Sequence, residues 1–371
     1  MSLGGESVVL ADQIMLKIRF RVPHLASTVS REEKYDVLIV TSKSMRVPAE
    51  RLASIKERQG MKVLIRYAED IYREYEGVDD AERIRNCIKE SVERYGVVFV
   101  IILGDSDVVP VRKVFIPDGA YDDDPEIDGA FVETDLYYAD LDGTWDDNRD
   151  GLWGDLRHDR IDGYPDVIVG RIPASNESEA LGVVEKISRY SPIWPLYSRV
   201  LFAGTDTFGV GYPEGEYLLE YSAKYVRNAS IVRLYETYGN LTRSSFIREL
   251  DEGCSIAAFT GHGMPTMLIL GMSQLYSVGD ALCQKNRVFP VFVALSCDAG
   301  RFDGVDGIGE SIVMNPRGGA IVFIGSTRIA WGYVGELVTE GLMGEMFWRT
   351  IRALFNDSLR SNVGMVWAKV I

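Results

Sequence analysis

The stretch 292-FVALSCDAGRFD-303 changes character abruptly at a single cysteine. Residues 292–296 are mostly apolar and predict a buried β-strand. Cys297 stands where this run ends, and Asp298 begins a short Asp-Ala-Gly segment that is typical of a turn. In a parallel sheet, ligands bind beyond the carboxyl ends of the strands. The pattern therefore places a thiol at the edge of the sheet where a substrate would lie.

A second apolar run also ends in a reactive side chain. Residues 255–263, SIAAFTGHG, place His262 between two glycines at the end of a predicted strand. If the two strands are parallel neighbours, His262 and Cys297 emerge at the same edge, which is the arrangement for acyl transfer by a thiolate with a histidine moving protons. The backbone amides of Gly263 and Cys297 are then candidate oxyanion donors. The alternative is that Cys297 is a packing residue, as many free cysteines are.

Short apolar runs alternate with helical segments along most of the chain. We expect strands at 35–42, 61–67, 97–105, 166–173, 199–205, 230–236, 255–263, 290–297 and 318–326. We expect helices between them, at 48–59, 79–95, 177–190, 214–227 and 242–250. Continuous apolar runs that alternate with helices indicate parallel strands covered on both faces. The sequence therefore predicts two α/β halves, each with a mainly parallel sheet.

Other patterns mark the ends of this alternation. Residues 13–21 alternate apolar and basic side chains, which predicts one half-buried strand, and SPIWPL at 191–196 carries two prolines that suggest a boundary. We divide the chain into an N-terminal strand segment that remains from a preceding region, a first subdomain and a second subdomain, over 1–34, 35–194 and 195–371. A last helix is expected to carry one apolar stripe, formed by Val334, Leu337, Val338, Leu342 and Met346.

Composition excludes several classes of protein. The 371 residues carry 40 Lys and Arg against 55 Asp and Glu, so the net charge is −15. Nucleic acid is therefore not an expected partner, whereas basic substrates or cations are. No apolar run approaches the roughly 18–20 residues of a membrane span, and the first residues lack the pattern of a secretory signal. Four widely spaced cysteines argue against a disulfide framework or a zinc site, and no pattern indicates an oligomeric state.

Six motifs, in order, resemble those of the gingipain-like cysteine peptidases. The second half contains FTGHG, VALSCDAGRFD and GGAIVFIGSTRIAWG, at 259–263, 293–303 and 318–332. The first half contains VIILGDSDVVP, ETDLYYADLDG and DVIVGRIPAS, at 100–110, 133–143 and 166–175. The resemblance covers most of 35–371. It implies the caspase-type fold, here an α/β three-layer sandwich of two subdomains, and a cysteine endopeptidase that acts on proteins or peptides.

The resemblance also implies roles for individual residues. His262 and Cys297 match the catalytic dyad, and Gly263 and Cys297 match the donors of the oxyanion hole. Asp166, just before the V-G-R strand, matches an acidic residue near the catalytic histidine, where some members have Glu. Trp331 matches a segment that flanks the primary specificity pocket. Family members act outside the cell or at its surface, so the same location is expected here.

The acidic stretch 140-DLDGTWDDNRDGLWGD-155 contains a D-x-N-x-D-G spacing that suits a hard cation, which needs about six or more oxygen ligands. Arg157 stands where an EF-hand has Glu, so Asp155 or Asp159 would close the site. Family members bind structural calcium, and we expect Ca²⁺ here. The expected ligands are Asp140, Asp142, Asp146, Asn148, Asp150 and Asp155. The alternative is a solvated acidic loop.

The substrate pocket is expected to prefer a basic residue before the scissile bond. This expectation rests on the net charge, on relatives that cleave after Arg or Lys, and on Asp298 and Asp303 near the nucleophile. Asp298 has a second interpretation, as the cap of a helix after the turn. Two other functions are compatible with the sequence: a sortase-like transpeptidase of the same fold, and a catalytically silent, calcium-stabilised binding module.

Overall fold

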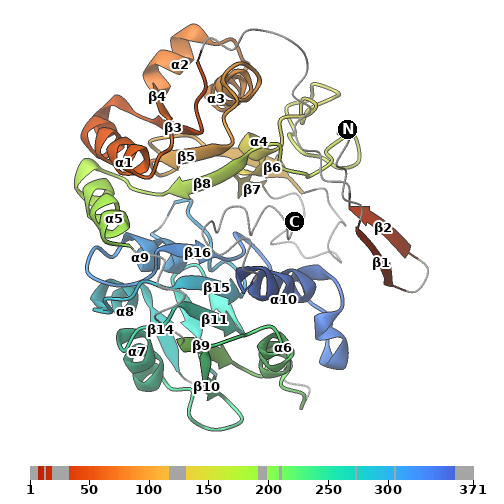
Figure 1. Cartoon of the computed structure of the whole chain (residues 1–371). Helices are drawn as coiled ribbons and strands as arrows, with labels where there is room; N and C mark the ends of the chain where they lie inside the picture. Colours follow the sequence, from red (N-terminus) through yellow and green to blue (C-terminus); the bar gives the residue numbers. More distant parts are fainter. Residues whose placement is uncertain are drawn as a thin grey trace.

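The computed structural model of the chain describes residues 7–11, 14–18, 33–116, 131–190, 199–208, 211–271, 274–304 and 306–355. Two parallel β-sheets, one in each half of the chain, are covered by helices (Figure 1). The predicted α/β class with two mainly parallel sheets is confirmed. None of the described helices is long and apolar enough to cross a membrane.

The first sheet has four parallel strands in the order β4-β3-β5-β8. Their bounds are Val37–Thr41 for β3, Val63–Tyr67 for β4, Phe99–Leu103 for β5 and Ile168–Ile172 for β8. The covering helices are α1 (Arg46–Arg58), α2 (Ala68–Glu74), α3 (Asp80–Glu90) and α5 (Glu177–Arg189). Leu38 and Val40 of β3 pack with α3, whereas Val37 and Ile39 pack with α1 and α5. Both faces are buried, which explains why β3 is a continuous apolar run.

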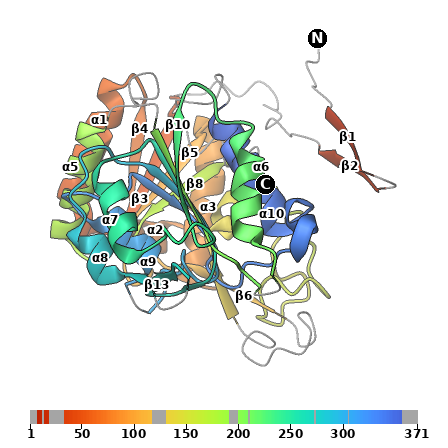
Figure 2. The same cartoon turned by 90° about the horizontal axis from the view of Figure 1, so that it is seen from below.

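The second sheet has five parallel strands in the order β10-β9-β11-β15-β16. The strands are β9 (Arg199–Gly204), β10 (Ser230–Tyr235), β11 (Ile256–Thr260), β15 (Val291–Leu295) and β16 (Val322–Ile324). α6 (Glu214–Ala223) and α10 (Leu342–Leu354) pack on one face. α7 (Arg243–Asp251), α8 (Val278–Cys283) and α9 (Ile308–Met314) pack on the other, and Figure 2 shows the two groups on opposite sides of the strands.

Smaller strands and helical turns lie outside the two parallel sheets. An antiparallel pair joins β6 (Arg112–Phe115) to β7 (Phe131–Thr134), and α4 (Leu136–Ala139) follows it. A three-stranded antiparallel sheet comprises β12 (Gly263–Met264), β13 (Met267–Ile269) and β14 (Leu275–Ser277). Short helical turns lie at Lys43–Met45 (η1), Ser91–Tyr95 (η2) and Gly335–Thr339 (η3).

Two sequence predictions need correction at the ends of the chain. The single strand expected at 13–21 is the shorter β2 (Ile14–Ile18), which pairs antiparallel with β1 (Ser7–Ala11). The single last helix is two elements, η3 and α10, because Gly341 between them has the left-handed φ of 74°. The predicted stripe is broken accordingly, with Val338 buried and Leu337 exposed. The boundary predicted at 191–196 lies outside the described residues.

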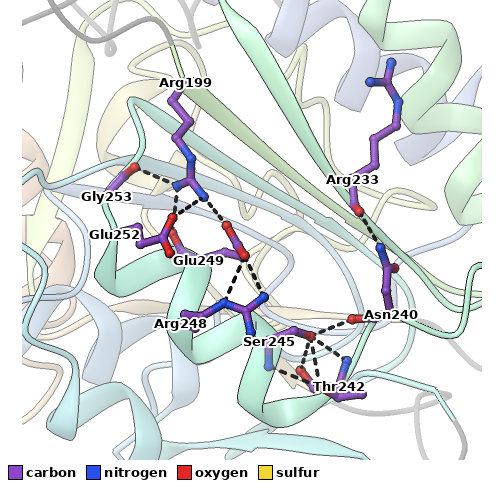
Figure 3. A network of polar contacts seen from close by, with 9 residues as sticks. All are labelled: Arg199, Arg233, Asn240, Thr242, Ser245, Arg248, Glu249, Glu252 and Gly253. Atoms are coloured by element: carbon purple, nitrogen blue, oxygen red, sulfur yellow. Dashed lines mark hydrogen bonds and ion pairs between the residues drawn. The ribbon is translucent and has the colours of Figure 1, made fainter.

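The amino end of β9 is held by an ionic network (Figure 3). The Arg199 guanidinium donates to the carbonyl oxygens of Glu249 and Gly253, at 2.9 and 2.8 Å, and also forms ion pairs with the Glu249 and Glu252 carboxylates. These bonds attach the end of α7 to the start of the strand. This network lies at the opposite end of the strand from the carboxyl end of the sheet, where Cys297 and His262 follow β15 and β11.

A buried lysine joins the two halves. Lys186 of α5 is fully buried, and its Nζ donates to the carbonyl oxygens of Val313, Asn315 at 2.9 Å and Gly318 at 3.3 Å. Burial lowers the pKa of Lys186 to about 7. The amine supplies donors to three carbonyl groups at the end of α9 and in the loop after it, so α5 and this segment depend on each other.

Replacing Lys186 with Met keeps the aliphatic stem but leaves these three carbonyl groups without their donor. We expect Lys186→Met to lower the free energy of unfolding by about 1–3 kcal/mol, measured by urea denaturation. Lys62→Met at an exposed lysine is the matched control and should change it by less than about 0.5 kcal/mol. Equal effects of the two substitutions would contradict a linking role for Lys186.

Candidate active site

The carboxyl ends of β11 and β15 lie side by side. The strands are parallel, and their register pairs Thr260 with Leu295. The ladder continues beyond it, because the Gly261 N–H donates to the Leu295 carbonyl at 3.1 Å. His262 and Cys297 each follow two residues after the last paired residue of their strands. His262 is exposed and Cys297 is partly exposed.

Gly263 packs directly against the end of β15. A Cβ atom on Gly263 would lie 1.9 Å from the Ser296 Oγ and 2.6 Å from the Cys297 carbonyl oxygen. Any side chain at this position would therefore force the two strand ends apart. The backbone of the GHG segment therefore lies against the residue that carries the thiol. The role of Gly263 and Cys297 as oxyanion donors stays a prediction.

A sharp turn follows the thiol. Asp298 has the left-handed φ of 55°, an uncommon conformation that Asp tolerates better than most residues. The Asp298 N–H donates to the Arg328 carbonyl at 3.0 Å, and the Ala330 N–H donates to the Cys297 Sγ at 3.4 Å. The segment 326–330 therefore runs along the turn and fixes the sulfur. Asp298 caps no helix, because α9 begins at Ile308 with Gly307 as its N-cap.

The other three cysteines have different surroundings. Cys87 and Cys254 are buried, and burial raises the pKa of both thiols, that of Cys254 to about 12. Cys283 is exposed at the end of α8. Because thiolate character and access govern thiol reactivity, Cys87 and Cys254 are poor nucleophiles.

A cavity of about 350 Å³ lies between the second sheet and α10. Its lining combines Leu295 of β15, Ile329 and Trp331 of the segment after β16, and Met346 of α10. Residues of the first half, at 116 and 132 beside the β6–β7 pair, complete the wall. Trp331 lines this cavity, and its role in a specificity pocket stays a prediction. Asp298 is absent from the described lining.

The charged groups around this cavity form pairs with one another. Arg328 lines the cavity, and its guanidinium forms ion pairs with Glu133 of β7 and with Asp303 at 3.3 Å. Asp303 also receives the Arg301 Nε at 2.9 Å. Burial alone would raise the pKa of Asp303, but the bonds from Arg301 and Arg328 outweigh it and hold the pKa below its usual value.

The sequence over residues 30–371 matches the model of peptidase family C25. The chain belongs to peptidase family C25. The predicted gingipain-like family is confirmed. The C25 chain is 24% identical to an uncharacterized protein of Archaeoglobus fulgidus over an alignment of 366 positions. The match covers 85% of this chain and 80% of the relative.

The fold of this C25 chain is that of solved gingipain structures. The complex of Porphyromonas gingivalis RgpB pro- and mature domains matches with a TM-score of 0.67 and 17% identity, over 90% of this chain and 73% of the other. The Arg-specific cysteine proteinase gingipain R (RgpB) matches with a TM-score of 0.64 and 16% identity, over 93% and 73%. The caspase-like architecture is thereby confirmed.

Asp166 of this C25 chain has a clear local contact. Its carboxylate accepts the Leu141 N–H at 2.8 Å, and its own N–H donates to the Ala139 carbonyl at 2.8 Å. These two bonds attach the start of β8 to the loop after α4. The role of Asp166 as an acidic partner of His262 stays a prediction.

The acidic loop does not gather its six predicted ligands into one cluster. Asp140 accepts the Gly163 N–H at 3.1 Å, whereas Asp155 accepts the Arg157 N–H at 3.0 Å. Asp146 accepts the N–H groups of Asp150 and Gly151, at 3.0 and 3.1 Å, within its own turn. In the part of the chain that the structure describes, no three His, Cys, Asp or Glu side chains converge closely enough to hold a metal ion.

One buried carboxylate beside this turn has an oxygen without a partner. Asp159 is 6% exposed; its Oδ1 accepts the Asp147 N–H at 2.8 Å, and its Oδ2 has no hydrogen-bond partner. Burial, together with the nearby carboxylates of Asp146 and Asp147, raises the pKa of Asp159. A buried, unpaired carboxylate oxygen is costly unless a cation approaches it, so Asp159 and the Asp146 turn fit a hard cation.

The contribution of α10 to the cavity and the pairing of Arg328 with Glu133 were not predicted from the sequence. Met346 and Phe347 line the cavity because α10 crosses the face of β15, a long-range packing that no local pattern reveals. Arg328 stands in the quoted STRIAWG motif, but its partner Glu133 lies almost 200 residues earlier in the chain, so sequence alone could not pair them.

Gly263 offers a direct test of the strand-end geometry. Gly263→Ala should lower the free energy of unfolding by about 1–3 kcal/mol, because the added methyl group overlaps Ser296 and Cys297. Gly332→Ala is the matched control, since a Cβ there meets nothing within 4 Å. Chemical denaturation measures both. A Gly263 variant as stable as the control would show that the two segments are not in contact.

Proposed function

We propose that this C25 peptidase is a cysteine endopeptidase that cleaves peptide bonds through an acyl-enzyme on Cys297. The observation that supports the proposal best is the register of β11 and β15, whose paired ends lie two residues before His262 and Cys297. Family membership supports the coarser statement, a cysteine-peptidase type of protein. Protein or peptide chains are the proposed substrates, and the proposed location is outside the cell or at its surface.

In the first step, His262 accepts the proton of the Cys297 thiol and the sulfur attacks the peptide carbonyl carbon. The carbonyl π electrons move to oxygen, and the amides of Gly263 and Cys297 donate to that oxyanion. His262 then gives its proton to the amine as the C–N bond breaks. A thioester on Cys297 remains, and the amine product leaves.

In the second step, a water molecule replaces the amine. His262 removes a proton from the water, the resulting hydroxide attacks the thioester carbon, and the C–S bond breaks. The sulfur takes back the proton and a carboxylic acid leaves. Asp166 is the proposed acidic partner that orients the imidazole, by its match to the family position.

Two other functions make different predictions. A sortase-like transpeptidase would let an amine, instead of water, attack the thioester, so mass spectrometry of products formed with an added amine acceptor separates the two. A catalytically silent binding module would hydrolyse nothing and would have no preferentially reactive thiol. The fixed orientation of the Cys297 sulfur, which accepts the Ala330 N–H, favours an enzyme over such a module.

Cys297→Ala should lower the hydrolysis of unfolded protein and of peptides by more than about 10³-fold, because the attacking atom is removed. Cys283→Ala removes an exposed thiol and is the matched control, with activity equal to the parent. Iodoacetamide should modify Cys297 faster than Cys283, and both much faster than the buried Cys87 and Cys254. Retained activity in Cys297→Ala would overturn the proposal.

We also propose a structural Ca²⁺ at the turn formed by Asp146, Asn148 and Asp150, with Asp159 beside it. The orphaned Asp159 Oδ2 is the observation that favours a cation there. A bound ion would offset the repulsion among these carboxylates and hold the loop in one conformation. It takes no part in the proposed peptide cleavage.

Ca²⁺ added to chelator-treated protein should raise the free energy of unfolding by about 2–3 kcal/mol once its concentration is about a hundredfold above Kd. Asp159→Asn should remove most of this gain, because a neutral amide binds the ion less well. Asp107→Asn, at an exposed carboxylate elsewhere, should leave the gain intact. A response that is equal in both variants, or no response at all, would favour the solvated acidic loop.

A further inference from the structure

We infer that the cavity beside Cys297 receives a large apolar side chain, of the size of Phe, Leu or Met, from the substrate residue that precedes the scissile bond. The inference rests on the proposed function, because it names the substrate class of the same site. It differs from the basic preference that the sequence suggested.

The cavity lies next to the segment that carries the thiol. Leu295, which lines the cavity, is the last residue of β15, and Cys297 follows it two residues later. Ile329 and Trp331 also line it, and the residue between them, Ala330, donates its N–H to the Cys297 sulfur at 3.4 Å. A substrate acylated on this sulfur therefore has the cavity next to its carbonyl carbon. The side chain adjoining that carbonyl is the one that reaches the cavity.

Apolar side chains make up much of the lining of the cavity. Val293, Ile324, Met343, Met346 and Phe347 contribute apolar side chains from β15, β16 and α10. The volume of about 350 Å³ lies within the ~300–1,000 Å³ usual for small-molecule pockets, so one large side chain fits inside the cavity with space to spare. The apolar area of such a side chain leaves water on entering this cavity, and this burial is what favours binding.

The carboxylates near the cavity are already paired with basic side chains of the chain itself. A buried Arg or Lys of a substrate needs a carboxylate that it can pair with. Glu133, whose side chain is 3% exposed, already pairs with Arg328 and with Lys113 at 3.2 Å. Asp303 already pairs with Arg301 and Arg328. The chain therefore supplies its own cations to these two acids, and a basic substrate side chain would enter beside the positive charge of Arg328.

An acidic substrate side chain is disfavoured for a related reason. Arg328 is the one charged residue in the described lining. Its Nη1 donates to Thr327 and Asp303, and its Nη2 to Glu133 and Asp303. An incoming carboxylate would have to displace these internal carboxylates. Gingipain R is named as Arg-specific, so this chain would share its fold and differ in the side chain that it accepts.

A peptide series that varies only the residue before the scissile bond tests the inference on the parent protein. We expect kcat/KM for Phe, Leu or Met to exceed that for Arg, Lys or Asp by at least about tenfold. Equal or faster cleavage after Arg, Lys or Asp would overturn the inference and leave the proposed peptidase function standing.

An affinity label separates the pocket from the chemistry of turnover. Peptidyl acyloxymethyl ketones that end in Phe or Arg alkylate an accessible thiol without the hydrolytic step, and mass spectrometry measures the rate at Cys297. Faster labelling by the Phe reagent, with no peptide cleaved, would support the pocket and refute the proposed function. Equal rates for the two reagents, or faster labelling by Arg, would refute the pocket.

A charge placed in the lining tests the site directly. Met346→Glu should lower kcat/KM for Phe peptides by about tenfold or more and raise that for Arg peptides, because it supplies an unpaired carboxylate. Leu337→Glu is the matched control, since Leu337 is 53% exposed and lies outside the cavity, and its specificity should equal that of the parent. The same shift in both variants would overturn the assignment. If Met346→Glu does not fold, the peptide series and the labelling rates on the parent decide.

Discussion

The backbone contact between Gly263 and the Ser296–Cys297 segment is the constraint on which the site depends. Two parallel strands of equal register end together, and the chain after one of them must pass so close to the other that no Cβ fits between. This contact sets the histidine and the thiol at one edge. It also fixes where the following turn must run, because Asp298 and Gly300 then bond to the segment that walls the cavity.

Sequence periodicity predicted the strands of both sheets, because their apolar runs follow from local burial. The strands of both parallel sheets were expected within a few residues of their observed ends, because strands covered on both faces are continuous apolar runs bounded by turn residues. The positions of His262 and Cys297 at neighbouring strand ends followed from the same reasoning once parallel pairing was assumed. Asp166 came from the family motif rather than from periodicity.

Features that depend on long-range packing were not predictable in this way. The last apolar stripe was read as one helix because spacing alone does not reveal that Gly341 takes a left-handed conformation. The acidic residues near the nucleophile suggested a basic preference, since the sequence shows carboxylates without their partners. Glu133 and Arg328 meet across the two halves of the chain, and Lys186 finds its three carbonyl groups in the opposite half.

The wall of the cavity is assembled from segments that are translated at very different times. Residues 116 and 132 emerge first, Cys297 much later, and α10 last of the described elements. A nascent chain that has been synthesised just past β15 contains Cys297 but does not yet contain α10, which closes the cavity. The cavity is therefore complete only after α10, the last described helix, has docked, so the chain carries the Cys297 thiol before the cavity exists.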